Sequence, residues 1–190
     1  MGSGLAAHIK KFVGLSEAEE AILLGYTRQL EIKKKTFLLK EGQVCKTSFF
    51  VEKGCLRLFF INEKGAEQTA QFAIENWWLA DYASFCSGAP SQFFIQAVEN
   101  SKITMFEKLS QDELYAKLPQ LERYFRHILE KSYGAAQWRI KYIFSLSKED
   151  QYRHFISSYP EFVQRIPQYM LASFLGLTPE YLSEIRKKKA

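Results

Sequence analysis

The chain has 190 residues, of which 47% are hydrophobic and 15% aromatic, and its formal net charge is +5. This composition supplies enough apolar surface for one large or two small folded domains, so a disordered chain is not the default expectation. No apolar run reaches the roughly 18 residues that a membrane helix needs, and residues 1–8 lack the apolar stretch of a signal peptide. We therefore expect a cytoplasmic protein that has no membrane partner.

The first predicted elements are helices, and strands follow them. Residues 6–30 have apolar positions at helical spacing, and Ser16 with Glu19 fits the capping box of a helix start. From residue 31 the period changes to two, which predicts short strands at residues 35–39, 47–51, 55–61, 67–73, 93–98 and 103–106. Gly42, Gly54 and Gly65 lie between strands and are expected to have positive φ. Six short strands with turns between them indicate a compact antiparallel sandwich or jelly-roll β-barrel.

After residue 108 the pattern is helical again. Ser110 is expected to cap a short helix, and Pro119 to begin a long one that runs to about Leu146. The long helix has two neighbouring apolar stripes, and we expect one stripe to pack on the barrel and the other to pair with a second subunit. The alternative is a helix that is wholly buried within one chain. The two stripes consist of residues 121, 124, 128, 135, 138 and 142, and of residues 125, 129, 136, 140 and 143.

The last 25 residues predict a helix-turn-helix. A helix opens at Gln168, Gly176 makes a tight turn, and Thr178 caps a second helix whose first residue is Pro179. Residues 139–190 also hold nine Lys/Arg against five Asp/Glu, and this excess is typical of a phosphate-binding module, although a solvated basic tail fits it as well. The second helix is expected to bury Leu182 and Ile185 and to present polar residues to base edges or phosphates. These polar residues are Glu180, Tyr181, Ser183, Glu184, Arg186 and Lys187.

With these elements in place, the chain resembles the Crp/Fnr family, the cyclic-AMP receptor protein regulators, and in particular a short Bacteroidetes-type branch of it. The resemblance covers nearly the whole chain and is most specific in the run LGLTPEYLSEIR at residues 175–186, with looser matches at ENWW (75–78) and GAPS (88–91). It implies an α+β fold with a cyclic-nucleotide-binding-like sensor barrel at residues 1–108, a dimerisation helix at 109–146 and a helix-turn-helix DNA-binding domain at 147–190. It also implies a homodimer that binds a palindromic double-stranded operator and has RNA polymerase as a partner.

The resemblance also carries site residues over, with departures. The family's ribose- and phosphate-binding positions match Ala80-Asp81 and Ser91-Gln92, so no arginine faces a cyclic phosphate. We therefore expect either a small-molecule effector other than cyclic AMP or no effector, with Asp81, Ser91 and Gln92 as the candidate ligand residues. In the second helix of the helix-turn-helix, the family's glutamate is kept as Glu180. Two arginines that read guanine are replaced by Pro179 and Glu184, and the backbone-contact positions match Gln168, Tyr169 and Thr178.

Two rival interpretations are an enzyme and a module that regulates a protein partner without binding DNA. Jelly-roll enzymes need two or three histidines that point into the barrel, whereas His8, His127 and His154 all lie outside the predicted strands, so we expect no catalysis and no metal. Cys45, Cys55 and Cys86 form no CxxC pair and are expected to be reduced thiols, mainly buried ones; a redox role stays open. Binding to mixed DNA separates the regulator from the protein-partner module.

Overall fold

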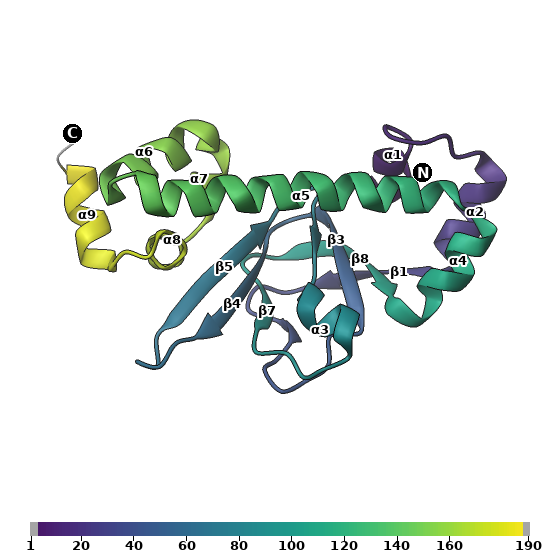
Figure 1. Cartoon of the computed structure of the whole chain (residues 1–190), viewed down its shortest axis with the longest axis horizontal. Coiled ribbons are helices and arrows are strands. Elements are labelled where there is room, and N and C mark those ends of the chain that lie inside the picture. Colours follow the sequence, from purple (N-terminus) through teal and green to yellow (C-terminus); the bar gives the residue numbers. More distant parts are fainter. Residues whose placement is uncertain (1–3, 188–190) are drawn as a thin grey trace. The chain divides into compact units, whose positions relative to one another are not determined.

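A computed structural model describes residues 4–187 of the chain (Figure 1). Within them the chain forms two compact units. The first comprises the residues up to Phe60 together with Ala70–Ile128, and the second comprises Ile61–Thr69 together with the residues from Leu129 onward. No helix among residues 4–187 is both long enough and apolar enough to cross a membrane.

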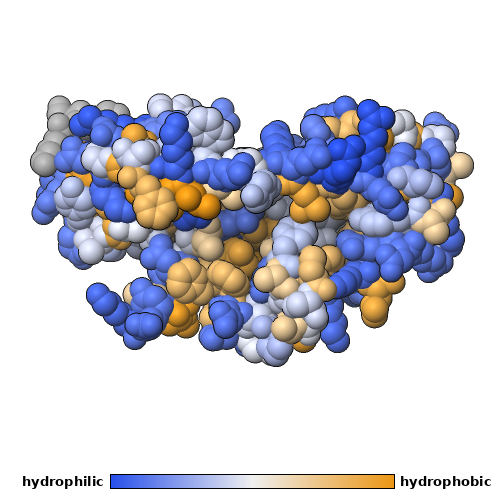
Figure 2. Space-filling view, viewed as in Figure 1, coloured by the Kyte–Doolittle hydropathy of each residue, from blue (hydrophilic) through white to orange (hydrophobic). Residues whose placement is uncertain are grey.

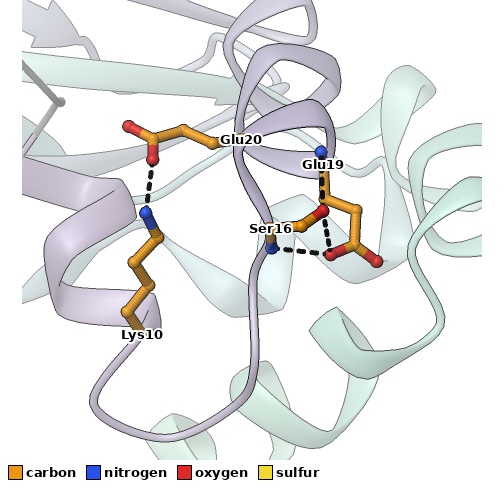
Figure 3. Close-up of polar contacts among 4 residues, drawn as sticks. All are labelled: Lys10, Ser16, Glu19 and Glu20. Carbon is orange, nitrogen blue, oxygen red and sulfur yellow. Dashed lines mark hydrogen bonds and ion pairs between the residues drawn. The ribbon is translucent and has the colours of Figure 1, made fainter.

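The first unit begins with two short helices, α1 (Gly4–Ile9) and α2 (Glu17–Gly25). The predicted capping box is confirmed, because Ser16 Oγ accepts from Glu19 N and the Glu19 carboxylate accepts from Ser16 N at 2.8 Å (Figure 3). The same figure shows Lys10 Nζ, in the turn directly after α1, paired with the carboxylate of Glu20 in α2; the two atoms are 2.6 Å apart. Hydrophilic residues cover most of the visible surface over these helices (Figure 2).

Among residues 4–187, eight strands form two four-stranded sheets, in the orders β1-β8-β3-β6 and β2-β7-β4-β5. Residues from both sheets meet in one apolar core, for example Phe49 and Ile103 from the first sheet with Leu56 and Ile95 from the second. Alternate residues of a strand face opposite sides, so the period of two in the sequence places these side chains inside. The predicted antiparallel barrel is therefore confirmed. The strands are β1 (Thr27–Ile32), β2 (Phe37–Leu39), β3 (Thr47–Lys53), β4 (Leu56–Ile61), β5 (Glu67–Ala73), β6 (Trp78–Leu79), β7 (Phe94–Ala97) and β8 (Ser101–Glu107).

Residues 27–30 were predicted to be helical, and this prediction is wrong. They belong to β1, which pairs with β8 along its whole length, from Thr27 opposite Phe106 to Ile32 opposite Ser101. The apolar positions of this segment fit either period, and the partner strand decides the outcome. The two-residue strand β6 and the short helix α3 (Tyr82–Ser87) were not predicted from the sequence.

The predicted turn glycines are confirmed, with φ of +82° at Gly42, +107° at Gly54 and +75° at Gly65. Gly54 has a second constraint, because a Cβ built on it would lie 2.2 Å from Ser101 Oγ and 2.8 Å from the Ser101 Cα. A side chain at this position therefore requires the backbone of β8 to shift.

The helical part contains more helices than predicted. The 3-10 helix η1 (Lys108–Ser110) and α4 (Gln111–Lys117) precede α5 (Gln120–Ser145), which begins directly after Pro119. Ser110 occupies the cap position of α4, but its side chain makes no capping hydrogen bond, because its backbone already has helical φ and ψ. Beyond α5 lie α6 (Lys148–Ser158), the unpredicted α7 (Pro160–Arg165), α8 (Gln168–Leu175) and α9 (Pro179–Lys187).

Candidate nucleic-acid interface

The turn between α8 and α9 has the predicted helix-turn-helix geometry. Gly176 ends α8 in the left-handed conformation, with φ +66° and ψ +39°, and its N–H donates to the carbonyls of Ala172 and Ser173. Thr178 Oγ1 accepts from Tyr181 N at 3.2 Å and so caps the first turn of α9. The two residues that the sequence singled out for the turn therefore act as predicted.

Helix α9 has one apolar face and one polar face. Leu182 is 1% exposed and Ile185 is 4% exposed, so both side chains hold α9 against the rest of its unit. The predicted contact residues of α9 are all exposed in the structure. They are Glu180, Tyr181, Ser183, Glu184, Arg186 and Lys187.

The start of α8 also presents polar groups. No side chain caps its first turn, because the cap residue is Pro167, and the N–H groups of Met170 and Leu171 donate to the Pro167 carbonyl. Tyr169 is 51% exposed, whereas Gln168 is partly buried and its Oε1 is buried without a hydrogen-bond partner. An uncapped helix start carries partial positive charge and N–H donors, which favour a phosphate oxygen. Lys188 and Lys189, the basic residues that follow α9 in the sequence, lie outside the described residues.

The C-terminal half of α5 exposes large apolar side chains. The exposed fraction is 67% at Tyr133, 54% at Trp138 and 56% at Ile140. The N-terminal half belongs to the first unit, where residues of both predicted stripes pack, including the buried Leu121 and the partly buried Phe125. We expected one stripe to be packed and the other to be exposed, and this is wrong. Both stripes are packed in the N-terminal half of α5, and both are exposed in its C-terminal half.

The predicted ligand residues are only partly brought together. Asp81 Oδ2 accepts from the Ser91 hydroxyl at 2.7 Å, and Asp81 Oδ1 accepts from the backbone N–H groups of Ala83 and Ser84, where it caps α3. Asp81 is 5% exposed and Ser91 is 2% exposed, whereas Gln92 is exposed. Asp81 and Ser91 are therefore buried and bonded to each other, whereas Gln92 lies on the surface.

This arrangement does not fit a cyclic phosphate. None of the three residues is a cation, and the Asp81 carboxylate would repel a second anion. Lys108 contacts α3 at its other end, where its Nζ donates to the carbonyls of Phe85 and Cys86. No group of three or more His, Cys, Asp or Glu side chains among residues 4–187 could hold a metal ion.

The cysteine side chains differ in burial, and one histidine is buried. Cys45 and Cys55 are buried free thiols, as expected. Cys86 is exposed and departs from that expectation. Burial raises the pKa of the Cys45 thiol. His8 is buried beside Tyr124, with Nδ1 at 2.9 Å from the tyrosine oxygen.

Comparisons with known proteins agree with this architecture. Residues 29–117 match the family model of the cyclic nucleotide-binding domain. Electron transport regulator A of Shewanella oneidensis is 25% identical over 171 residues, which cover 83% of this chain and 67% of that protein. The anaerobic regulatory protein of Pasteurella multocida is 24% identical over 169 residues, which cover 83% of this chain and 61% of that protein. The chain thus spans about two thirds of the length of these curated relatives or somewhat less.

Solved structures share the fold. FixK2 from Bradyrhizobium japonicum has a TM-score of 0.73 at 13% identity, with 85% of this chain and 83% of that chain covered. The global regulator CLP of Xanthomonas campestris, described as responsive to c-di-GMP, has a TM-score of 0.73 at 15% identity, with 91% of each chain covered.

A nucleotide-binding-type barrel, a long helix and a C-terminal helix-turn-helix together define a class of protein, the DNA-binding transcription regulators with a sensor barrel. The comparisons confirm the resemblance predicted from the sequence: residues 29–117 match the cyclic nucleotide-binding domain, and the chain is similar to curated regulators and solved structures of the Crp/Fnr type. Its place in a Bacteroidetes-type branch, the three domain boundaries and the individual contact residues stay predictions.

Proposed function

We propose that α9 is the recognition helix of a homodimeric regulator and that it enters the major groove of double-stranded DNA. The observation that carries this proposal is the two-faced character of α9, with Leu182 and Ile185 buried and every predicted contact residue of α9 exposed. A recognition helix needs this division, because one face must hold it to the domain while the other reaches base edges. Gln168, Tyr169 and Thr178, around the two helix starts, are proposed to contact the phosphate backbone and so to set the register.

The test is binding to duplex DNA over a range of salt concentrations. Counterion release predicts that log K falls with log salt by about 0.9 for each phosphate contact. Replacing Arg186 and Lys187 with alanine should weaken binding to all sequences similarly and reduce this slope. Glu180→Ala should instead relax the base preference, because a carboxylate accepts from the amino group of cytosine. If the two variants behave alike, the assigned roles are wrong.

A regulatory module that acts only on a protein partner would show almost no binding to mixed DNA. That result would favour this alternative over the DNA-binding regulator. The curated relatives are named as regulators, so we expect no enzymatic activity.

We propose that the exposed part of α5 forms the homodimer. Its apolar residues at positions 129, 133, 136, 140 and 143 keep the alternating four-three spacing of a coiled-coil seam. Ile140→Glu should convert a dimer into a monomer in analytical ultracentrifugation. Lys131→Glu is the control, because nine residues on a helix place it on the side opposite Ile140. In a dimer the two recognition helices should lie roughly 34 Å apart, which requires an imperfectly palindromic operator.

We further propose that cyclic nucleotides are not the effector of this regulator, since Asp81 and Ser91 are bonded to each other and bring no cation. The regulator would respond to another small molecule or to none. Titration calorimetry with cyclic AMP and cyclic GMP should therefore give no heat of binding, and a saturable signal would contradict the proposal. RNA polymerase as a partner and a cytoplasmic location complete the proposed function.

A further inference from the structure

The C-terminal end of α8 is held by side chains from other parts of the second unit. The last four carbonyls of a helix have no partner within it. Two of these carbonyls accept from cations: Phe174 O from Arg139 Nη2 and Leu175 O from Lys148 Nζ, both at 3.1 Å. Cations at this end also oppose the negative end of the helix dipole. The guanidinium of Arg139 lies 4.1 Å from the centre of the Phe174 ring, and burial lowers its pKa.

A third set of contacts comes from the turn between β4 and β5. Ser173 Oγ accepts from Thr69 N at 2.8 Å and donates to Glu67 O at 2.7 Å. Gln68 Nε2 donates to the Ser173 carbonyl. One residue of α8 is therefore bonded to three consecutive residues that lie more than 100 positions earlier in the chain.

The geometry of this contact is that of a strand edge. β5 is the last strand of its sheet, so one of its sides lacks a neighbouring strand. The carbonyl of Glu67 and the N–H of Thr69 point to the same side of the strand, two residues apart. The Ser173 hydroxyl satisfies both groups, as the backbone of a neighbouring strand would. Thr69 is completely buried, so an unpaired N–H at this position would be costly.

We propose that Ser173 is a positioning residue for DNA recognition, and that its bonds to Glu67, Gln68 and Thr69 form a clasp that sets the orientation of α8. Only three residues connect α8 with α9, and the two helices pack on each other, so the orientation of α8 determines that of α9. Because β4 and β5 are also strands of the barrel sheet, a shift of these strands changes the orientation of the recognition helix. This inference rests on the proposed function, and the clasp is a route by which the barrel regulates it.

The experiment compares Ser173→Ala with Ser157→Ala. Ser157 is a matched control, because its exposed hydroxyl bonds only to the His154 carbonyl of its own helix in the contacts described. Hydrogen exchange is measured for the peptides that cover residues 61–69 and 168–177. In Ser173→Ala both peptides should exchange faster, on the order of tenfold, because each lost hydrogen bond contributes about 1 kcal/mol, and 1.4 kcal/mol is a factor of ten. Gln68→Ala, which leaves the serine in place, should accelerate the same two peptides.

DNA binding provides the second readout. Ser173→Ala should lower the affinity for duplex DNA about tenfold at every salt concentration, with an unchanged salt slope, because Ser173 contacts no phosphate. Faster exchange in residues 168–177 alone would overturn the clasp, since it would mean a local defect of α8. Exchange and affinity equal to those of Ser157→Ala would overturn it as well. If the unmodified protein binds no DNA, the proposed function fails, whereas coupled exchange of the two peptides still reports whether the clasp exists.

Discussion

Two glycines of the second unit should respond to the same substitution in opposite directions. Gly176 ends α8 with φ +66°, where an alanine costs about 1–2 kcal/mol because its Cβ approaches the backbone carbonyl. The built Cβ would also lie 3.3 Å from Lys148 Nζ, which donates to the Leu175 carbonyl, so the substitution disturbs a contact that holds α8. Gly176→Ala should therefore lower the free energy of unfolding of the protein by about 1–2 kcal/mol.

Gly134 lies inside α5, and a Cβ built on it meets no atom within 4 Å. A glycine within a helix is less stable than alanine by about 0.5–1 kcal/mol, because it loses more backbone freedom on folding. Gly134→Ala should therefore raise the free energy of unfolding by that amount. Urea denaturation followed by circular dichroism measures both changes.

Gly176→Asn provides the control, because asparagine tolerates the left-handed region better than alanine and should lose less stability. The reasoning is refuted if Gly176→Ala is as stable as the unmodified protein. It is also refuted if both alanine variants change stability in the same direction, since the backbone conformation would then not be what requires glycine at position 176.

Three further predictions concern single side chains. Tyr124→Phe removes the oxygen that accepts from Trp78 Nε1 at 2.9 Å, and the buried unpaired N–H should lower the free energy of unfolding by about 1–3 kcal/mol in urea denaturation; a change below about 0.5 kcal/mol would contradict this. Burial raises the pKa of Tyr82 to about 12 from its ordinary value of 10, so the folded state holds the proton more tightly and stability should fall as pH rises from 10 to 12. Unfolding midpoints measured across that range should show a smaller fall in Tyr82→Phe, and an unchanged fall would exclude this tyrosine as a contributor. Thr178→Ala should lower the free energy of unfolding by about 1 kcal/mol and Thr178→Ser by less, and equal losses in thermal melts would mean that the cap hydroxyl does not stabilise α9.

Local signals in the sequence were sufficient for much of this protein. The capping box at Ser16, the glycine turns of the barrel and the Gly176–Thr178 turn each depend on residues within four positions of one another. The backbone conformation of a glycine and the cap of a helix are decided at that range, so these elements were predicted correctly. The two faces of α9 also followed from the spacing of Leu182 and Ile185 alone.

The tertiary structure decided what depends on distant partners. Residues 27–30 became a strand because β8 supplies the hydrogen bonds that a helix would otherwise have made. Asp81 and Ser91 were predicted to face a ligand, but the fold brings them together and they bond to each other. Ser173 had no signal in the sequence at all, because its partners lie more than 100 residues away, and only the folded sheet presents an edge that a serine hydroxyl can complete. Periodicity in a sequence specifies which side of an element is buried. Which residues pack against that side depends on contacts between segments that are far apart in the sequence.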